Sequence, residues 1–269
     1  MREESLKFWK IEELSEVVEV LEDAFGDTIE KYKSGLTYND ILIRAYAYAI
    51  IVMKEIVCLL SNGFPDGALA RARRLYEQMV LIDYFESRKK DLDFDGLVER
   101  YCDSQNIAAY SNQIALYDFF ENEEEKQKAK KEFDKLKDKY AKFFKQKNYV
   151  RDYWWLDDEK CDTFNKLQKR YCDPYGRILY SRACISTHAG AMGDYALLGR
   201  FNPNGEKIYT GTTDLGFSLP LILATMSFYN ITNMVFGNLE IAFPKEHKKI
   251  EELLNYYQNT LFVTLEIQN

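Results

Sequence analysis

The sequence is poor in histidine, proline and glycine, and each shortage narrows the choice of fold and function. Of 269 residues, two are histidines, five are prolines and 13 are glycines. So few helix breakers over this length favour long helices. Histidine exchanges protons near neutral pH more readily than other side chains, so His188 and His247 are the imidazole candidates for acid–base chemistry. His247 lies in a lysine-rich stretch and is predicted to be at the surface.

Several catalytic and metal-binding signatures are missing as well. The five cysteines form no Cys-x-x-Cys pair, which makes a zinc site of that type unexpected. The sequence has neither a phosphate-binding loop nor a Gly-x-Ser-x-Gly nucleophile motif. It opens on a charged stretch rather than an apolar signal segment, so we predict a cytoplasmic protein with free thiols. We expect no metal and no cofactor.

Charge and hydropathy set further limits. The net charge of −7 gives no overall attraction to nucleic acid, so an RNA partner requires a local basic patch. One segment, Leu215–Leu239, carries no charged residue and is long enough to span a bilayer. It also contains several serine, threonine and asparagine residues, which favour a buried core helix. We therefore expect no membrane partner, and a membrane-associated protein stays the minor alternative.

The hydrophobic spacing predicts an all-α protein, a single-domain bundle of long antiparallel helices spanning residues 1–269. Expected helices cover about 3–25, 38–60, 67–90, 97–120, 158–171, 174–198, 220–243 and 246–261. One small hairpin is expected near residues 202–209. A charged helical excursion covers about 121–147, where Glu, Asp and Lys surround a narrow apolar stripe. It is interpreted as a solvated helix, and an arm that contacts nucleic acid is the alternative.

The helix predicted after Pro174 carries the first candidate site. Positions four apart lie on one side of a helix, so Tyr180, Cys184 and His188 form one line, with Arg177 near it. A guanidinium, a phenol, a thiol and an imidazole together could hold a phosphate and move a proton. The alternative is an ordinary packed helix face, because tyrosine and cysteine at this spacing usually belong to a core.

The helix predicted over 67–90 carries a second set of polar residues. Arg73 and Glu77 are four residues apart and can form an ion pair. If this helix is central, the pair is at least half buried, and a buried charge needs a partner. Such a pair either joins two neighbouring helices or lines a polar cavity, and the sequence alone leaves both open.

These residues resemble a bacterial family known as domain of unknown function 5677. The family pattern is a helix–turn–helix ending in Arg-x-x-x-Glu, then a tryptophan-containing stretch, then Tyr-x-x-x-Ser-x-x-x-His. The positions that match it are Arg73, Glu77, Trp154, Trp155, Tyr180 and His188. Cys184 stands where the family has serine, which puts any role of a hydroxyl at that position in doubt.

A looser resemblance involves Arg182 and His188, whose spacing is similar to the Arg-x(4–6)-His motif of the HEPN helical superfamily. That resemblance implies a metal-independent ribonuclease of a defence or toxin system, with both residues acting on the scissile phosphate, across a homodimer interface. Ala183 follows the arginine, where the family usually has a polar residue. On a regular helix Arg182 points about 120° away from His188, so a bend or a partner chain must bring both to one phosphate.

Four hypotheses follow from the sequence. The first is a HEPN-like ribonuclease with RNA as its partner, with His188 and Arg182 as catalytic residues. The second is a non-catalytic helical module that binds a ligand or a protein and uses the same polar residues structurally. A cysteine-dependent enzyme built on Cys184 and a membrane-associated protein are the third and fourth. A homodimer is expected because shared helical sites favour two-fold pairing.

Overall fold

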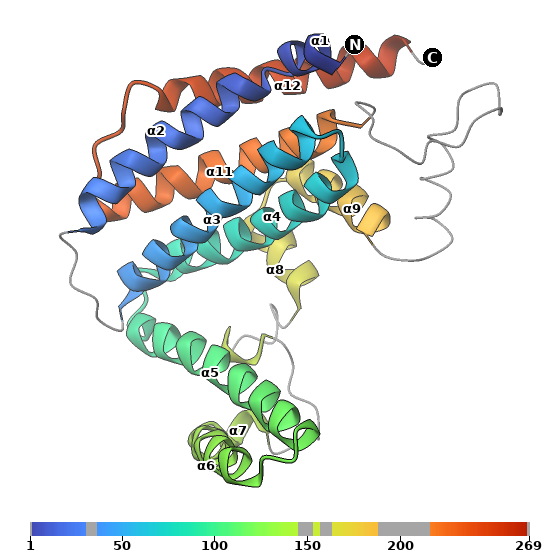
Figure 1. Ribbon diagram of the computed structural model, residues 1–269. Helices are drawn as coiled ribbons and strands as arrows, with labels where there is room; N and C mark the ends of the chain where they lie inside the picture. Colours follow the sequence, from blue (N-terminus) through green and yellow to red (C-terminus); the bar gives the residue numbers. More distant parts are fainter. Residues whose placement is uncertain (1, 31–36, 145–152, 157–162, 188–215, 268–269) are drawn as a thin grey trace. The chain divides into compact units, whose positions relative to one another are not determined.

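The computed structural model describes residues 2–30, 37–144, 153–156, 163–187 and 216–267, and the regular elements in these ranges are all helical. The all-α prediction is therefore confirmed for this part of the chain (Figure 1). The helices are α1 (Arg2–Phe8), α2 (Ile11–Ile29), α3 (Tyr38–Ser61), α4 (Pro65–Arg88), α5 (Phe94–Phe119), α6 (Glu123–Lys139), α7 (Ala141–Phe144), the 3₁₀ turn η1 (Trp154–Leu156), α8 (Phe164–Tyr171), α9 (Pro174–Thr187), α11 (Ser218–Leu239) and α12 (His247–Ile267). The predicted hairpin near residues 202–209 lies outside the described residues.

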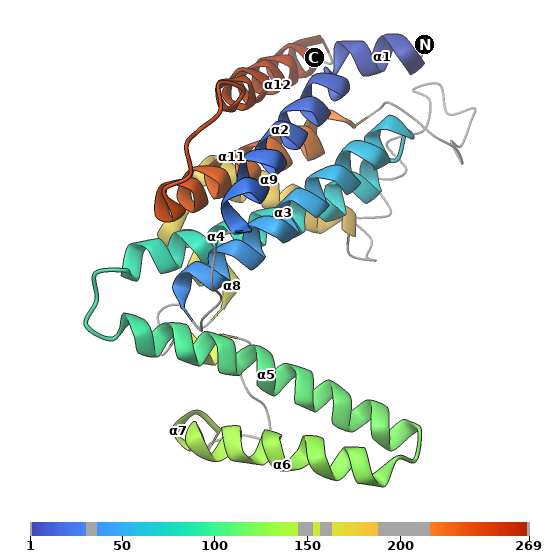
Figure 2. The ribbon, with the colours of Figure 1, turned by 60° about the vertical axis from the view of Figure 1, so that its left-hand side comes forward.

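The chain divides into two compact units. The first comprises Met1–Gly35, Asn39–Glu86 and Cys172–Asn269, and the second comprises Leu36–Tyr38 and Ser87–Tyr171. In the first unit, α3 and α4 run side by side in both views, and α12 packs along α2 and α11 (Figure 1, Figure 2). The first unit contains most of the apolar core and the helices that carry the predicted site.

Tyr46 of α3 lies at the centre of the first unit, with none of its surface exposed. Its ring stacks on Phe228 of α11 with centroids 5.7 Å apart, and it meets Phe25 and Phe236 edge-on. The Tyr46 hydroxyl shares a 3.2 Å hydrogen bond with the Thr232 hydroxyl. Burial raises the pKa of Tyr46, so the hydroxyl stays protonated. An aromatic cluster with one satisfied polar bond thus joins α2, α3 and α11.

The uncharged run forms α11, and most of its residues are buried within the first unit. By length and composition α11 is the one helix in the described ranges that could cross a membrane. The buried Thr225 hydroxyl has no hydrogen-bond partner among the described residues, but two other hydroxyls of α11 are satisfied along the helix. Ser227 donates to the Leu223 carbonyl at 2.7 Å and Thr232 to the Phe228 carbonyl at 2.8 Å. Such local bonds let polar side chains lie inside a helical core.

The predicted N-terminal helix is interrupted, in contrast to the single helix expected over about 3–25. The backbone turns at Lys10, whose φ of 50° lies in the left-handed region, and α2 begins at the next residue. Tyr256 of α12 donates a 2.7 Å hydrogen bond to the Phe8 carbonyl just before the turn. The interruption therefore coincides with a tertiary contact that the local pattern of apolar residues does not reveal.

The charged excursion is also shorter than predicted. Instead of one helix over 121–147, α6 ends at Lys139 and a short α7 follows; residues 145–147 lie outside the described part. In the second unit α6 folds back along α5 as a helical hairpin (Figure 2). At its end Tyr140 donates a 2.7 Å hydrogen bond to Asp103 of α5, and its ring lies against Trp154. These contacts bury Tyr140, whereas the other residues of the apolar stripe are half-buried.

Candidate functional site

α9 begins where the sequence predicts, because an aspartate and a proline stand at its first turn. Asp173 accepts a 2.9 Å hydrogen bond from the Gly176 backbone N–H, and Pro174 occupies the first helical position. Gly176 permits close packing, since a Cβ there would lie 3.1 Å from the Tyr76 ring and 3.2 Å from the Met226 methyl. The N-terminal end of α9 is therefore seated directly on α4 and α11.

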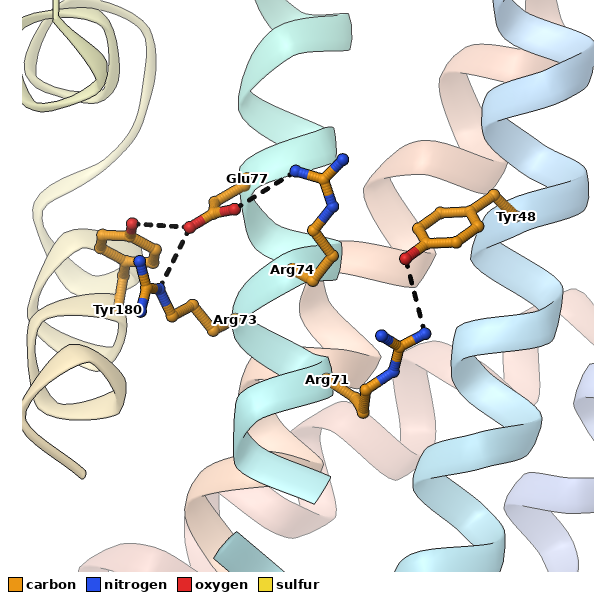
Figure 3. A network of polar contacts seen from close by, with 6 residues as sticks. All are labelled: Tyr48, Arg71, Arg73, Arg74, Glu77 and Tyr180. Carbon is orange, nitrogen blue, oxygen red and sulfur yellow. Dashed lines mark hydrogen bonds and ion pairs between the residues drawn. The ribbon is translucent and has the colours of Figure 1, made fainter. Parts of the chain in front are cut away.

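Glu77 of α4 holds three donors from two helices (Figure 3). Its Oε1 accepts a 2.9 Å bond from the Tyr180 hydroxyl of α9 and a 3.1 Å bond from the Arg73 Nε. Its Oε2 is 3.5 Å from the Arg74 Nη1. The ion pair predicted between Arg73 and Glu77 is present within α4, and the bond from Tyr180 connects it to α9. We call Arg73, Glu77 and Tyr180 the clamp.

The Tyr180 ring is enclosed between partners from α4. It stacks on Tyr76 with centroids 5.1 Å apart, and the Arg73 guanidinium carbon lies 5.5 Å from its centroid. Burial, followed by the charge of Glu77, raises the pKa of the Tyr180 phenol, so the hydroxyl is a permanent donor near neutral pH. Burial opposes the charge on Arg73, but the bond to Tyr180 and the nearby acidic groups raise its pKa overall.

The chemistry available to the clamp is therefore positioning rather than proton transfer. Hydrogen bonds to a charged group contribute about 1.5–3 kcal/mol each, and Glu77 accepts such bonds from both helices. With its lone pairs engaged by three donors, Glu77 is poorly placed to act as a general base. The clamp fixes the rotation of α9 about its axis and its position along α4. It therefore also fixes the direction in which the end of α9 points.

The other predicted site residues differ in their burial and in the residues that they contact. Cys184 is half buried one turn after Tyr180 and neighbours the phenol. Arg177 faces Tyr76 and Cys172 instead of Glu77. Arg182 is exposed on the solvent side of α9. His188 directly follows α9 and lies outside the described residues, so the structure does not address its contacts.

His247, the second histidine, is not the free surface residue that its lysine-rich surroundings suggested. It is half buried, with Tyr229 at 5.3 Å and Phe243 at 4.5 Å between ring centroids. Burial lowers the pKa of its imidazole, because the charged form loses hydration. Its packing is that of a structural residue.

The structure also reveals an acidic cluster near the start of α9 that sequence reasoning missed. Burial, then Glu86 and Asp173, raise the pKa of Asp83 from 3.8 to about 7. Burial also raises the pKa of Cys172 to about 12. Glu86 accepts a 2.8 Å hydrogen bond from Asn238 of α11. A signal existed in the sequence, because Asp83 and Glu86 stand three residues apart on an otherwise apolar stretch of α4.

On its other side, α4 is tied to α3 by a second set of polar contacts. Gln78 donates a 2.6 Å bond to the Ala45 carbonyl. Arg71 forms an ion pair with Glu55 and lies 3.5 Å from the Tyr48 hydroxyl. α4 therefore has polar connections to both neighbours, α9 through the clamp and α3 through Arg71 (Figure 3).

The described ranges hold neither a cluster of metal ligands nor a disulfide. These ranges contain no group of three or more His, Cys, Asp or Glu side chains arranged to hold a metal ion. The four described cysteines, Cys58, Cys102, Cys172 and Cys184, form no disulfide with one another. The expectations of no cofactor and of a cytoplasmic location stay predictions.

One comparison with known proteins gives a match. A family model described as a family of unknown function, DUF5677, matches residues 39–206, which is more than half of the chain. The match spans α3 to α9 and so includes the clamp. No curated protein and no solved structure matches the chain.

Proposed function

The chain belongs to the family of unknown function DUF5677, and we propose that it is a metal-independent endoribonuclease of a bacterial defence or toxin type. In this proposal His188 takes the proton from the ribose 2′-hydroxyl and Arg182 holds the scissile phosphate. The 2′-oxygen attacks phosphorus and forms a 2′,3′-cyclic phosphate, the bond from phosphorus to the 5′-oxygen breaks, and the leaving 5′-oxygen takes its proton from water. The guanidinium stabilises the charge that develops on the phosphate oxygens.

The observation that supports this proposal is the combination of a fixed helix with an exposed guanidinium. The clamp and the close contact at Gly176 hold α9 on α4, while Arg182 on the outer side of α9 is exposed. His188 comes directly after this helix in the sequence. Catalysis requires groups held in a fixed geometry, and an anchored helix provides such a support. A homodimer, in which one chain supplies Arg182 and its partner His188, is part of the proposal.

Growth of an expression host provides the first test. Induction of the wild-type chain is expected to slow growth, and His188→Ala is expected to abolish this effect while the protein stays soluble with an unchanged melting temperature. His247→Gln is the matched control, because it removes the other imidazole, which packs between rings. Toxicity that persists in His188→Ala, or that disappears equally in His247→Gln, contradicts the proposal.

A second candidate is a non-catalytic module that binds a ligand or protein, and the saturation of the clamp favours it. Glu77 and Tyr180 already satisfy one another, which is what a purely structural cluster needs. Under this alternative His188→Ala changes stability or helicity and leaves RNA untouched. Circular dichroism on the same variants separates the two candidates.

A further inference from the structure

α4 carries more positive charge on the face between α3 and α9 than its neighbours neutralise. Arg71, Arg73 and Arg74 fall within four residues, and among the described residues their acidic partners are Glu55 and Glu77. Each glutamate can balance one guanidinium, so the described part of this face keeps one excess positive charge. The excess is notable in a chain whose net charge is −7.

The guanidinium that is left over is that of Arg74. Arg73 is bound to Oε1 of Glu77 at 3.1 Å, and its side chain is 23% exposed. Arg74 reaches Oε2 only at 3.5 Å, at the outer limit of a hydrogen bond, and its side chain is 57% exposed. Figure 3 shows Arg73 turned toward α9 and Arg71 toward Tyr48 of α3, with Arg74 between them. Arg74 therefore has most of its donors directed to solvent.

The spacing of these arginines destabilises α4. Arg71 and Arg74 are three residues apart, so they are neighbours along one side of α4, and like charges at this spacing destabilise a helix. Glu55 lies on α3 and binds Arg71 from there. The Arg71 Nε is buried, and it has no hydrogen-bond acceptor among the described residues. A bound dianion near Arg71 and Arg74 would remove the repulsion.

We propose that Arg74, with Arg71 beside it, binds a phosphate group carried by a nucleotide or by an RNA strand. Glu77 and Glu55 hold the guanidiniums of Arg73 and Arg71 in place. The Arg74 fork, which reaches Glu77 only at 3.5 Å, can turn outward to make two parallel N–H···O bonds to phosphate oxygens. This phosphate site lies on α4 and does not involve Arg182 or His188. It goes beyond the proposed nuclease activity and holds whether or not the chain cleaves RNA.

The test measures binding on the His188→Ala chain, so that cleavage cannot consume the probe. Titration calorimetry uses pyrophosphate and AMP, and fluorescence anisotropy uses a labelled oligouridylate. Arg74→Gln is expected to weaken binding about ten-fold, the loss of one charge-assisted contact. Arg44→Gln is the matched control: Arg44 is an exposed arginine on α3, and its removal should leave affinity within about two-fold.

The two phosphate sources give different results. If the oligouridylate is the ligand, Arg74→Gln also lowers the slope of log affinity against log salt by about 0.7, the value for one phosphate contact on a single strand. If a nucleotide is the ligand, AMP and pyrophosphate show the dependence on Arg74 and the oligonucleotide does not. Arg74→Lys keeps the charge but loses the fork, and we expect an intermediate affinity.

Either pattern supports the phosphate site. The absence of binding by all three probes contradicts it, and so does binding that Arg74→Gln leaves unchanged or that Arg44→Gln weakens equally. Because Arg74 is exposed, its replacement should not unfold the chain, and a melting curve checks this. If the wild-type chain does not cleave RNA but still binds phosphate through Arg74, the nuclease proposal is refuted and the phosphate site stands.

Discussion

Removal of the Tyr180 hydroxyl should weaken the attachment of α9 to α4 by a measurable amount. Tyr180→Phe keeps the ring, which stacks on Tyr76 and contacts Arg73. It deletes the 2.9 Å bond from the hydroxyl to Glu77, together with the weaker contacts of that hydroxyl with Arg73 and Cys184. A hydrogen bond to a charged acceptor contributes about 1.5–3 kcal/mol. Glu77 keeps Arg73 and Arg74 as donors in the variant, so we expect a loss near the lower end, about 1.5 kcal/mol.

A double-mutant cycle with Glu77→Gln isolates the contact itself. Urea unfolding followed by circular dichroism gives the free energy of unfolding of the wild type, both single variants and the double variant. Groups in direct contact couple by about 0.5–3 kcal/mol, and we expect at least 1 kcal/mol for this pair. Hydrogen exchange of the α9 amides should rise in Tyr180→Phe, because α9 then opens more often.

Tyr175 supplies the matched control on the same helix. Its hydroxyl oxygen is buried and has no hydrogen-bond partner among the described residues, so Tyr175→Phe removes no hydrogen bond and should not lower the free energy of unfolding. If Tyr180→Phe costs no more than Tyr175→Phe, or if the effects of Tyr180→Phe and Glu77→Gln simply add, the clamp does not hold α9 as argued.

Three further predictions concern other parts of the chain. The pKa of Asp83 is about 7 in the folded state against 3.8 ordinarily, so this carboxyl lowers stability as pH rises from about 4 to 7. Asp83→Asn should therefore raise the melting temperature more at pH 8 than at pH 4.5, and an equal change at both contradicts this. Trp154 contacts Tyr140 in the second unit, and Trp154→Ala should cost about 3 kcal/mol by urea unfolding; a loss below about 1 kcal/mol would mean that the hairpin does not depend on it. Tyr46→Phe leaves the buried Thr232 hydroxyl with only its bond to the Phe228 carbonyl. This change should cost about 1 kcal/mol in the same assay. An unchanged free energy of unfolding would mean that the bond between Tyr46 and Thr232 does not stabilise the protein.

The helical fold could be predicted from the sequence because local signals agree with the tertiary structure along most of the chain. Asp173 and Pro174 marked the start of α9, and the uncharged run became α11 within two to four residues of its expected ends. The failures have tertiary causes. The turn at Lys10 accompanies a contact with α12, and α6 stops where Tyr140 reaches Asp103. Neither contact leaves a trace in the local spacing of apolar residues.

The candidate site was predictable only in part. Helical spacing sufficed for the pair Arg73–Glu77, because both residues stand on one helix. The bond from Tyr180 to Glu77 joins residues 103 positions apart, and no local rule links them. Spacing alone also placed Arg177 with Tyr180, whereas the packing of α9 against α4 turns it toward Cys172. The chemistry of Arg182 and His188 stays a prediction.

The central claim, that an α9 clamped onto α4 supports an RNA-cleaving Arg182 and His188, is tested most directly by one cleavage assay. Purified wild type, His188→Ala, Arg182→Ala and Tyr180→Phe are incubated with single-stranded RNA in the presence of EDTA. We expect cleavage by the wild type, none by His188→Ala or Arg182→Ala, and reduced cleavage by Tyr180→Phe. Intact RNA with the wild-type chain, or undiminished cleavage by His188→Ala, contradicts it.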